Sequence, residues 1–483
     1  MKNKSTFFHH KGKTFRFRQI FLWTLSYSAK FLQIYRNLTV FVLIFPYPVI
    51  PFADHRYTER KAGNPPFPGF FPALPVICDP AFMVSGPPLL SIEEDESMSE
   101  SMMKEPISRR TFLKLAAGSA AGALLFHFPF QASAAEETAK TLEIRPCALS
   151  ALPAAEESAK NSPLVKDSFK DIISQVNTIH DSGLKSAVLS MINHPEPSFM
   201  ENYSSSSTIQ KIYNKLVEMK LADPSKITAE TLLPPHPSRL QPFMTAPGSG
   251  YMSHHPYPGG LATHVSSNLH ITAGICRTYK DVFGYHVDYD TAMAGQALHD
   301  IEKPFVFQWQ KDGSSRKEYT LAGQGAHHVL SIAESMYRGI PSEVVVAQAC
   351  AHGAPSNPKD EGDVVGWIKT AALIAGKDPV RHGYLRKDGE GLPAPHKQEG
   401  YIVHLGDHDW VLTSPASQKS IAILKKAASS LYSIDAEKNP EKFNRFRNYI
   451  GSQVSFMYIN HLSSFPDGEK QIEGLVEKII IKD

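Results

Sequence analysis

Apolar residues recur every three to four positions through most of the chain after residue 164, which is the spacing of an amphipathic helix. In the segment 207–220, for example, Ile209, Ile212 and Leu216 follow this spacing. Residues 232–257 break the pattern, because they are dense in Pro, Gly and His and cannot form a regular helix. The sequence therefore predicts an all-α fold. Helices are expected at 166–192, 207–220, from about 261, and at 292–303, 329–337, 342–351, 417–432, 441–462 and 471–481.

Composition narrows the class of protein without choosing a function. The chain has 483 residues, of which 42% are hydrophobic and 20% are charged, and its formal net charge is +2. Such a chain can bury a core and has room for more than one domain. The nearly balanced charge gives no reason to expect a nucleic-acid partner. The four cysteines show no CxxC spacing, so we expect no disulfide framework.

A short segment near residue 110 resembles a twin-arginine export signal. It reads Ser-Arg-Arg-Thr-Phe-Leu-Lys over 108–114, followed by a weakly hydrophobic run at 115–130 and Ala-Ser-Ala at 132–134. The run is too short to span a bilayer, and the small residues suit a cleavage site after Ala134. The alternative is a buried helix with a chance arginine pair. The resemblance implies that the twin-arginine translocase is a partner and that the protein is periplasmic or secreted.

The residues that precede this signal are unusual, because a signal belongs at the N-terminus. Residues 1–97 are rich in aromatic residues, Pro and Lys/Arg and show no helical or strand period. We interpret them as a misassigned or unstructured extension, with translation beginning at Met98, Met102 or Met103. The alternative is a membrane anchor at 31–52, but an arginine, an asparagine and several prolines interrupt that stretch. No stable membrane anchor is therefore expected.

The remaining chain divides by composition. An Ala/Glu/Ser/Pro-rich stretch follows the cleavage site and is typical of a tether. The expected order is an extension at 1–97, a signal at 98–134, a tether at 135–163, a helical segment at 164–233, a catalytic domain at 234–414 and C-terminal helices at 415–483.

Histidines and acids stand at the ends of successive predicted helices within 234–414. His264 lies just inside a helix start, the doublet His299–Asp300 ends an apolar helix, and Asp407 follows an apolar stretch. Neutral imidazoles and carboxylates are common metal ligands in proteins, and a buried charge at these places needs a partner. The sequence therefore predicts a metal site from residues that lie far apart in the chain. The candidate ligands are His264, His299, Asp300, His328, His352 and Asp407.

Two of these ligands have a competing neighbour. His327 is adjacent to His328, and we prefer His328 for its spacing from Gly323. Asp409 competes in the same way with Asp407. Taken alone, any one of the 21 histidines is more often a surface or satisfied core residue than a ligand.

The ordered series His, His-Asp, His, His and Asp resembles the HD-domain superfamily of metal-dependent phosphohydrolases. The more specific likeness is in the segment 254–261, which reads His-His-Pro-Tyr-Pro-Gly-Gly-Leu, and in Tyr319-Thr320 followed by Gly323 and His328. The resemblance implies an HD-type helical bundle with additional flanking helices. It implies that one divalent ion is bound by His264, His299, Asp300 and Asp407, and that His328 and His352 complete a second site. The ion expected is Mn, Ni, Fe, Co or Zn.

The resemblance also implies hydrolysis of a small-molecule phosphoester, in which metal-activated water attacks phosphorus and Asp300 bridges two ions. Lys303 and His255 are the expected substrate contacts, and Asp300 and Lys303 the catalytic residues. The chain departs from the family in having Glu302 before Lys303, where many members have Gly, and in having one histidine at 352 where many have a pair. The alternatives are a di-iron oxygenase on the same scaffold and a non-catalytic module that binds a metal or a nucleotide.

Overall fold

The computed structural model describes residues 141–395 and 397–483. The expected N-terminal extension, the expected export signal and the first residues of the expected tether lie outside this range. The described part is almost entirely helical, with only short two-residue strands, which confirms the predicted all-α fold. No helix within it is both long and apolar enough to cross a membrane.

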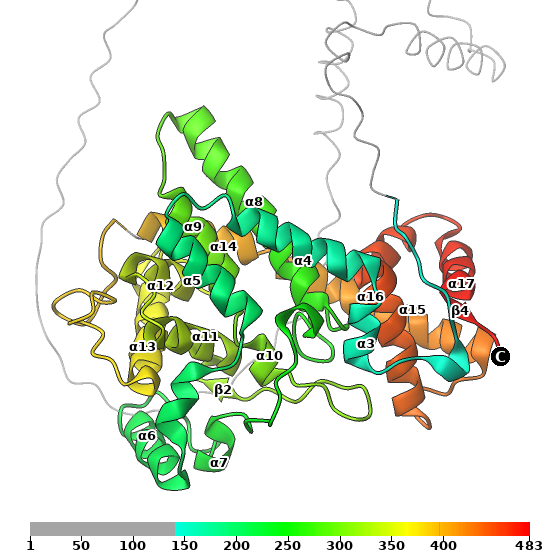
Figure 1. Ribbon diagram of the computed structural model, residues 1–483, viewed down its shortest axis with the longest axis horizontal. Coiled ribbons are helices and arrows are strands. Elements are labelled where there is room, and N and C mark those ends of the chain that lie inside the picture. Colours follow the sequence, from blue (N-terminus) through cyan, green and yellow to red (C-terminus); the bar gives the residue numbers. More distant parts are fainter. Residues whose placement is uncertain (1–140, 396) are drawn as a thin grey trace, which may run out of the picture. The chain divides into compact units, whose positions relative to one another are not determined.

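The helices fall into three consecutive groups along the chain (Figure 1). The first group is α3 (Ala155–Lys160), α4 (Pro163–Val176), α5 (Ser182–Asn193), α6 (Ser206–Glu218) and α7 (Ala229–Leu232). The second is α8 (Gly260–Phe283), α9 (Tyr289–Leu298), α10 (Lys303–Val306), α11 (Ala326–Tyr337), α12 (Ser342–Ala349), α13 (Pro358–Ala375) and α14 (Lys397–Asp407). The third is α15 (Trp410–Tyr432), α16 (Pro440–Leu462) and α17 (Gly468–Ile479). Short strands are β1 (Cys147–Ala148), β2 (Thr320–Leu321), β3 (Gln324–Gly325) and β4 (Ile480–Ile481).

Local capping explains where the first helices begin. Ser162 accepts a hydrogen bond from the backbone of Val165 at the start of α4, and Asp181 does the same for Leu184 at the start of α5. An N-cap side chain satisfies one of the free backbone N–H groups of the first turn. The segment 166–192, expected as one helix, is therefore two helices, because the cap at Asp181 starts a second one.

The segment expected as a tether is structured from residue 141 onward. β1 pairs in parallel with β4 near the C-terminus, with Cys147 opposite Ile480. In α3, Ser158 and Ala159 are fully buried, and this helix packs against α16. These backbone and side-chain contacts fix residues 141–163 on the C-terminal helices.

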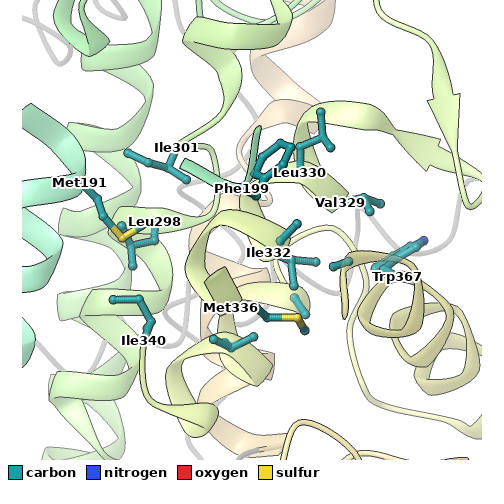
Figure 2. Packing of buried hydrophobic residues seen from close by; sticks show 14 of the residues in the cluster. Met191, Phe199, Leu298, Ile301, Val329, Leu330, Ile332, Met336, Ile340 and Trp367 are labelled. Atoms are coloured by element: carbon teal, nitrogen blue, oxygen red, sulfur yellow. The ribbon is translucent and has the colours of Figure 1, made fainter. Parts of the chain in front are cut away.

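The buried side chains form two main clusters. The larger one fills the space between α4, α5 and the helices α8 to α13, and Figure 2 shows part of it, including Phe199, Leu298, Ile332 and Trp367. The second lies among α15, α16 and α17. Tyr257, from the loop before α8, belongs to the second cluster. The boundary expected at 414 falls inside α15, so the third group of helices begins earlier than the sequence indicated.

Candidate metal centre

The predicted ligands stand at helix ends that converge in space. His264 lies in the second turn of α8, and Asp407 is the last residue of α14. His299 caps the C-terminus of α9, and Asp300 follows it directly. α8, α9 and α14 pack against one another, and α12 packs against α9 and α14. The fold therefore brings together residues separated by more than a hundred positions in the sequence.

The turn before α8 depends on two glycines. Gly259 has φ +81°, a left-handed conformation that side chains rarely adopt. A Cβ on Gly260 would lie 1.9 Å from the carbonyl oxygen of His255. The glycine pair thus lets the loop that carries His254 and His255 fold tightly against the start of α8.

The first group of ligand atoms is compact and completely buried. His264 Nε2 lies 3.2 Å from Asp300 Oδ2 and 3.1 Å from Asp407 Oδ1. His299 Nε2 lies 3.1 Å from Asp300 Oδ2 and 3.3 Å from Asp407 Oδ1. All four side chains are 0–1% exposed. Two imidazoles and two carboxylates thus surround one point.

A second group adjoins the first through the same two acids. Asp300 Oδ1 lies 3.5 Å from His327 Nε2, and Asp407 Oδ2 lies 3.3 Å from His352 Nε2. One ligand atom each from Asp300, His327 and His352 lie within 4.8 Å of one another. The two oxygens of Asp300 therefore face different groups of histidines.

The structure places His327, not His328, in the second group. His328 Nε2 is instead 3.1 Å from the carbonyl oxygen of Ala349, and its ring stacks on that of His352 with centroids 4.2 Å apart. Burial and the neighbouring His352 ring lower the pKa of His328 well below its usual value. His328 thus supports His352 by packing, and the preference drawn from the spacing to Gly323 does not agree with the geometry.

Hydrogen bonds on the far side of two rings fix which nitrogen faces the acids. His299 Nδ1 donates to the carbonyl oxygen of Gln296 at 2.6 Å. His327 Nδ1 donates to Glu318 Oε1 at 2.5 Å. A histidine that donates through one nitrogen presents the lone pair of the other, which is the usual arrangement behind a metal-binding imidazole. Both Nε2 atoms are thereby prepared as ligands.

Lys303 and Glu302, which follow the His-Asp doublet, have opposite surroundings. Lys303 is fully buried, and its Nζ contacts Asp300 Oδ2 at 2.5 Å and lies 3.3 Å from His254 Nε2. Glu302 is also fully buried, and burial together with the nearby Glu334 raises its pKa well above the usual value. The pKa of Glu302 is thus raised, whereas the contact with Lys303 helps to lower the pKa of Asp300.

The charges of the centre set the protonation of its ligands. Burial would raise the pKa of Asp300, but His299 and Lys303 hold it well below its usual value. Burial alone would lower the pKa of His299, yet the carboxylates of Asp300 and Asp407 raise it to about 10. In the absence of a cation, a proton on His299 therefore balances part of the negative charge.

The residues present fit a bound divalent cation. His299 Nε2, His327 Nε2 and Asp300 Oδ1 are buried without a hydrogen-bond partner. Buried polar atoms left without partners are costly unless something else satisfies them. Imidazole nitrogens and carboxylate oxygens are the ligands that Mn²⁺, Fe²⁺, Co²⁺, Ni²⁺ and Zn²⁺ accept.

His255 and Asp409 lie behind the first ligand. Asp409 Oδ1 is 3.8 Å from His264 Nδ1, and one ligand atom each from His255, His264 and Asp409 lie within 4.8 Å of one another. Nδ1 of His255 lies 3.1 Å from the hydroxyl of Tyr257. Asp407 rather than Asp409 faces the first ligand group, and Asp409 contributes its carboxylate on the other side of the His264 ring.

Sequence reasoning did not find Glu318, Gln296 or Asn268. Glu318 lies in a segment without a recognisable motif, and Gln296 acts through its backbone carbonyl, for which side-chain identity gives no signal. Asn268 stands four residues after His264 on α8 and therefore on the same helix face, so its position was available from the sequence. Its amide nitrogen donates to Asp407 Oδ1 at 3.0 Å.

The chain is similar, over part of its length, to a protein of Methanocaldococcus jannaschii named dihydroneopterin 2',3'-cyclic phosphate phosphodiesterase. The two sequences are 35% identical over 107 residues. The match covers 22% of this chain and 42% of the archaeal protein, so the chain spans less than half of that relative. No family model and no solved structure matches the chain.

Proposed function

We propose that this protein is a metal-dependent phosphohydrolase that cleaves a small-molecule phosphoester. The observation that carries the proposal is the position of Asp300, whose two oxygens face two separate groups of histidines. A centre of this kind would hold two divalent ions a few ångströms apart, as two-metal phosphoesterases do. The similarity to a protein named as a phosphodiesterase supports the same reaction class.

The residues of the centre have separable roles in this proposal. His264, His299, Asp300 and Asp407 would hold the first ion, and His327 and His352 would hold the second together with Asp300. The ions supply Lewis acidity, which lowers the pKa of water and neutralises charge on phosphoryl oxygens.

The positively charged and hydrogen-bonding residues prepare this site before substrate arrives. Lys303 keeps Asp300 ionised through direct contact, and Glu318 orients His327 through its Nδ1. Because Lys303 is fully buried, we infer that its main role is to keep Asp300 ionised. A phosphate oxygen would reach it only by joining that contact.

Substrate approaches from the side of the second group. His352 and His327 have 14% and 9% of their side chains exposed, whereas the side chains of the first group are closed to solvent. His255 is buried beside His264 with its Nε2 unpartnered, so it would donate to a phosphate that enters this far. Its ring, rather than Lys303, is the freer of the two expected substrate contacts.

The test measures metal content and turnover together. The wild-type protein, prepared without metal and then loaded with Mn²⁺ or Ni²⁺, should hydrolyse a chromogenic phosphodiester. 2',3'-cyclic nucleotides are the first natural-type substrates to try, because the archaeal relative is named for a 2',3'-cyclic phosphate. Asp300→Ala should lose both metal and activity. The control is Asp378→Ala, which removes an exposed aspartate that accepts hydrogen bonds from the backbone of Val380 and Arg381.

Two results would overturn this function. An Asp300→Ala protein that keeps its full metal content would show that the centre is elsewhere. Tightly bound iron in a protein that hydrolyses no phosphoester and consumes oxygen would show an oxygenase instead.

We further propose that the protein is exported by the twin-arginine route to the periplasm or beyond, with neither a nucleic-acid partner nor a stable membrane anchor. The support is the segment Ser-Arg-Arg-Thr-Phe-Leu-Lys at 108–114, which resembles the signal for a route that carries folded proteins. Replacing Arg109 and Arg110 by lysine should retain the protein inside the cell, and the exported protein should begin at Ala135. Unchanged export of the double variant would contradict the route.

A further inference from the structure

Asn268 points its amide into the first ligand group. It lies on α8 one turn after His264, and its side chain is completely buried. Its Nδ2 donates to Asp407 Oδ1 at 3.0 Å and lies 3.2 Å from His264 Nε2. Its Oδ1 has no hydrogen-bond partner. One end of this amide thus lies against two ligand atoms, and the other end is buried and unsatisfied.

The distances place the amide end where another ligand would be. Two ligand atoms bound to one ion at about 2.0–2.2 Å lie roughly 3.0–3.4 Å apart when they are neighbours in a tetrahedral or octahedral site. The four contacts among His264, His299, Asp300 and Asp407 are 3.1–3.3 Å. The two contacts of Asn268 Nδ2, at 3.0 and 3.2 Å, fall in the same range.

An amide N–H cannot face a cation, because it presents a partial positive charge. The two ends of an asparagine amide have nearly the same shape, and a turn of about 180° around the last side-chain bond exchanges them. That turn puts Oδ1 beside His264 Nε2 and Asp407 Oδ1. The hydrogen bond to Asp407 is given up, but that oxygen is then satisfied by the ion.

We propose that Asn268 is an additional oxygen ligand of the ion in the first group, bound through Oδ1. This inference rests on the proposed metal centre and specifies which ion that centre prefers. A neutral fifth donor raises the coordination number without adding charge. It therefore favours Mn²⁺ or Fe²⁺, which accept oxygen ligands and five or six positions, over Zn²⁺, which is usually four-coordinate.

Two substitutions separate this role from a simpler one, in which the amide only donates to Asp407. Asn268→Leu removes both ends of the amide, and Asn268→Asp supplies an oxygen ligand but no donor. If Asn268 is a ligand, the leucine variant should bind Mn²⁺ at least about tenfold more weakly than wild type. The aspartate variant should then bind Mn²⁺ as tightly as wild type or more tightly. If Asn268 is only a donor, Asn268→Asp should bind Mn²⁺ more weakly than Asn268→Leu, because the new carboxylate and that of Asp407, about 3 Å apart, repel each other.

The measurement is the dissociation constant for Mn²⁺ alone, by chelator competition on the full-length protein. Co²⁺-loaded protein gives a second readout, because the visible absorption of Co²⁺ becomes more intense when the leucine variant removes a ligand. The control is Asn448→Leu, since Asn448 is also buried, donates through Nδ2 to Gly313 at 2.7 Å and has an unpartnered Oδ1. The control should bind Mn²⁺ as wild type does.

Binding of Mn²⁺ by Asn268→Leu within threefold of wild type would overturn the inference, and so would weaker binding by Asn268→Asp than by Asn268→Leu. If the leucine variant does not fold, the aspartate variant alone decides, because the two roles predict opposite changes in its affinity. A wild-type protein that binds none of Mn²⁺, Fe²⁺, Co²⁺, Ni²⁺ and Zn²⁺ would overturn the metal centre as well, which distinguishes the two failures.

Discussion

Replacing Gly406 by alanine tests whether the close packing of α14 places Asp407 in the centre. A Cβ at Gly406 would lie 2.1 Å from Thr272 Oγ1 on α8 and 2.3 Å from Gln296 Oε1 on α9. These two atoms form a buried hydrogen bond of 2.9 Å with each other. The methyl group therefore enters a space that is already filled, so the Thr272 and Gln296 side chains, α14, or both must shift. Asp407 is the next residue, so it moves with the helix.

The cost can be worked from these contacts. Overpacking a buried position costs about 1–3 kcal/mol. Breaking the Thr272–Gln296 hydrogen bond and leaving its ends buried costs about 1–3 kcal/mol more. Alanine returns about 1 kcal/mol because it favours the helix over glycine. The free energy of unfolding should therefore fall by about 1–5 kcal/mol, and Mn²⁺ affinity should fall with it, because the Asp407 oxygens leave both ligand groups.

The assay is thermal unfolding of the metal-free and metal-loaded protein, together with a Mn²⁺ titration. The matched control is Gly274→Ala in the interior of α8, where an added Cβ meets nothing within 4 Å. That control should gain up to about 1 kcal/mol from helix propensity alone and bind Mn²⁺ normally. If Gly406→Ala melts no lower than wild type and binds Mn²⁺ equally well, the packing of α14 does not position Asp407, and this reasoning fails.

Further outcomes are expected at the centre. His327→Ala should lower the bound metal by one ion per chain. His328→Ala should keep both ions but lower the melting temperature, because the buried His328 ring bonds to the backbone carbonyl of Ala349. Equal metal loss in the two variants would contradict the assignment of His327. In metal-free protein the pKa of His299 is raised to about 10 from about 6.5 in the unfolded chain. Its contribution to stability is therefore complete below about pH 6.5 and is lost as the pH rises toward 10, so melting of the EDTA-treated protein should drop over this window. A flat profile would refute this. Lys303→Met should lower kcat at least about tenfold and shift its acidic limb to higher pH, because Asp300 loses its cation and its pKa rises; an unchanged kcat–pH profile would count against this role of Lys303.

Helical periodicity was sufficient to predict the all-α fold, because most helices bury one face and keep the other in solvent. Interruptions between helices that depend on a single capping side chain were harder to predict. Asp181 caps α5 within the segment Asn-Thr-Ile-His-Asp-Ser-Gly at 177–183, whose turn and cap residues interrupt the apolar pattern. The signal for two helices was therefore present, but the apolar spacing on either side favoured one. The Ala/Glu-rich segment after the expected cleavage site has the composition of a tether, yet β1 pairs with β4 more than three hundred residues away. Composition does not report such a long-range backbone contact.

The order of histidines and acids was sufficient to predict that these residues lie together, because each of them lies at or near the end of a helix. The choice between His327 and His328 could not be made in the same way. Adjacent residues on a helix point about 100° apart, so only the packing of α11 against its neighbours decides which ring meets Asp300. Glu318 and the carbonyl of Gln296 orient the ligands by accepting hydrogen bonds from His327 and His299. No sequence motif marks residues that play this supporting role. The export signal and the start of translation lie outside the described residues and remain predictions from sequence.

Tyr257 couples the local unfolding of the loop before α8 to that of the C-terminal helices. Its ring packs edge-on against Phe456 of α16, while its hydroxyl contacts Thr263 at the start of α8. Opening α15 to α17 removes the packing of that ring and frees the turn that holds His264. Backbone amides near the start of α8 should therefore exchange with solvent at the same rate as those of α16. A protease cut in the third group of helices should therefore loosen the start of α8 and weaken metal binding without touching a ligand.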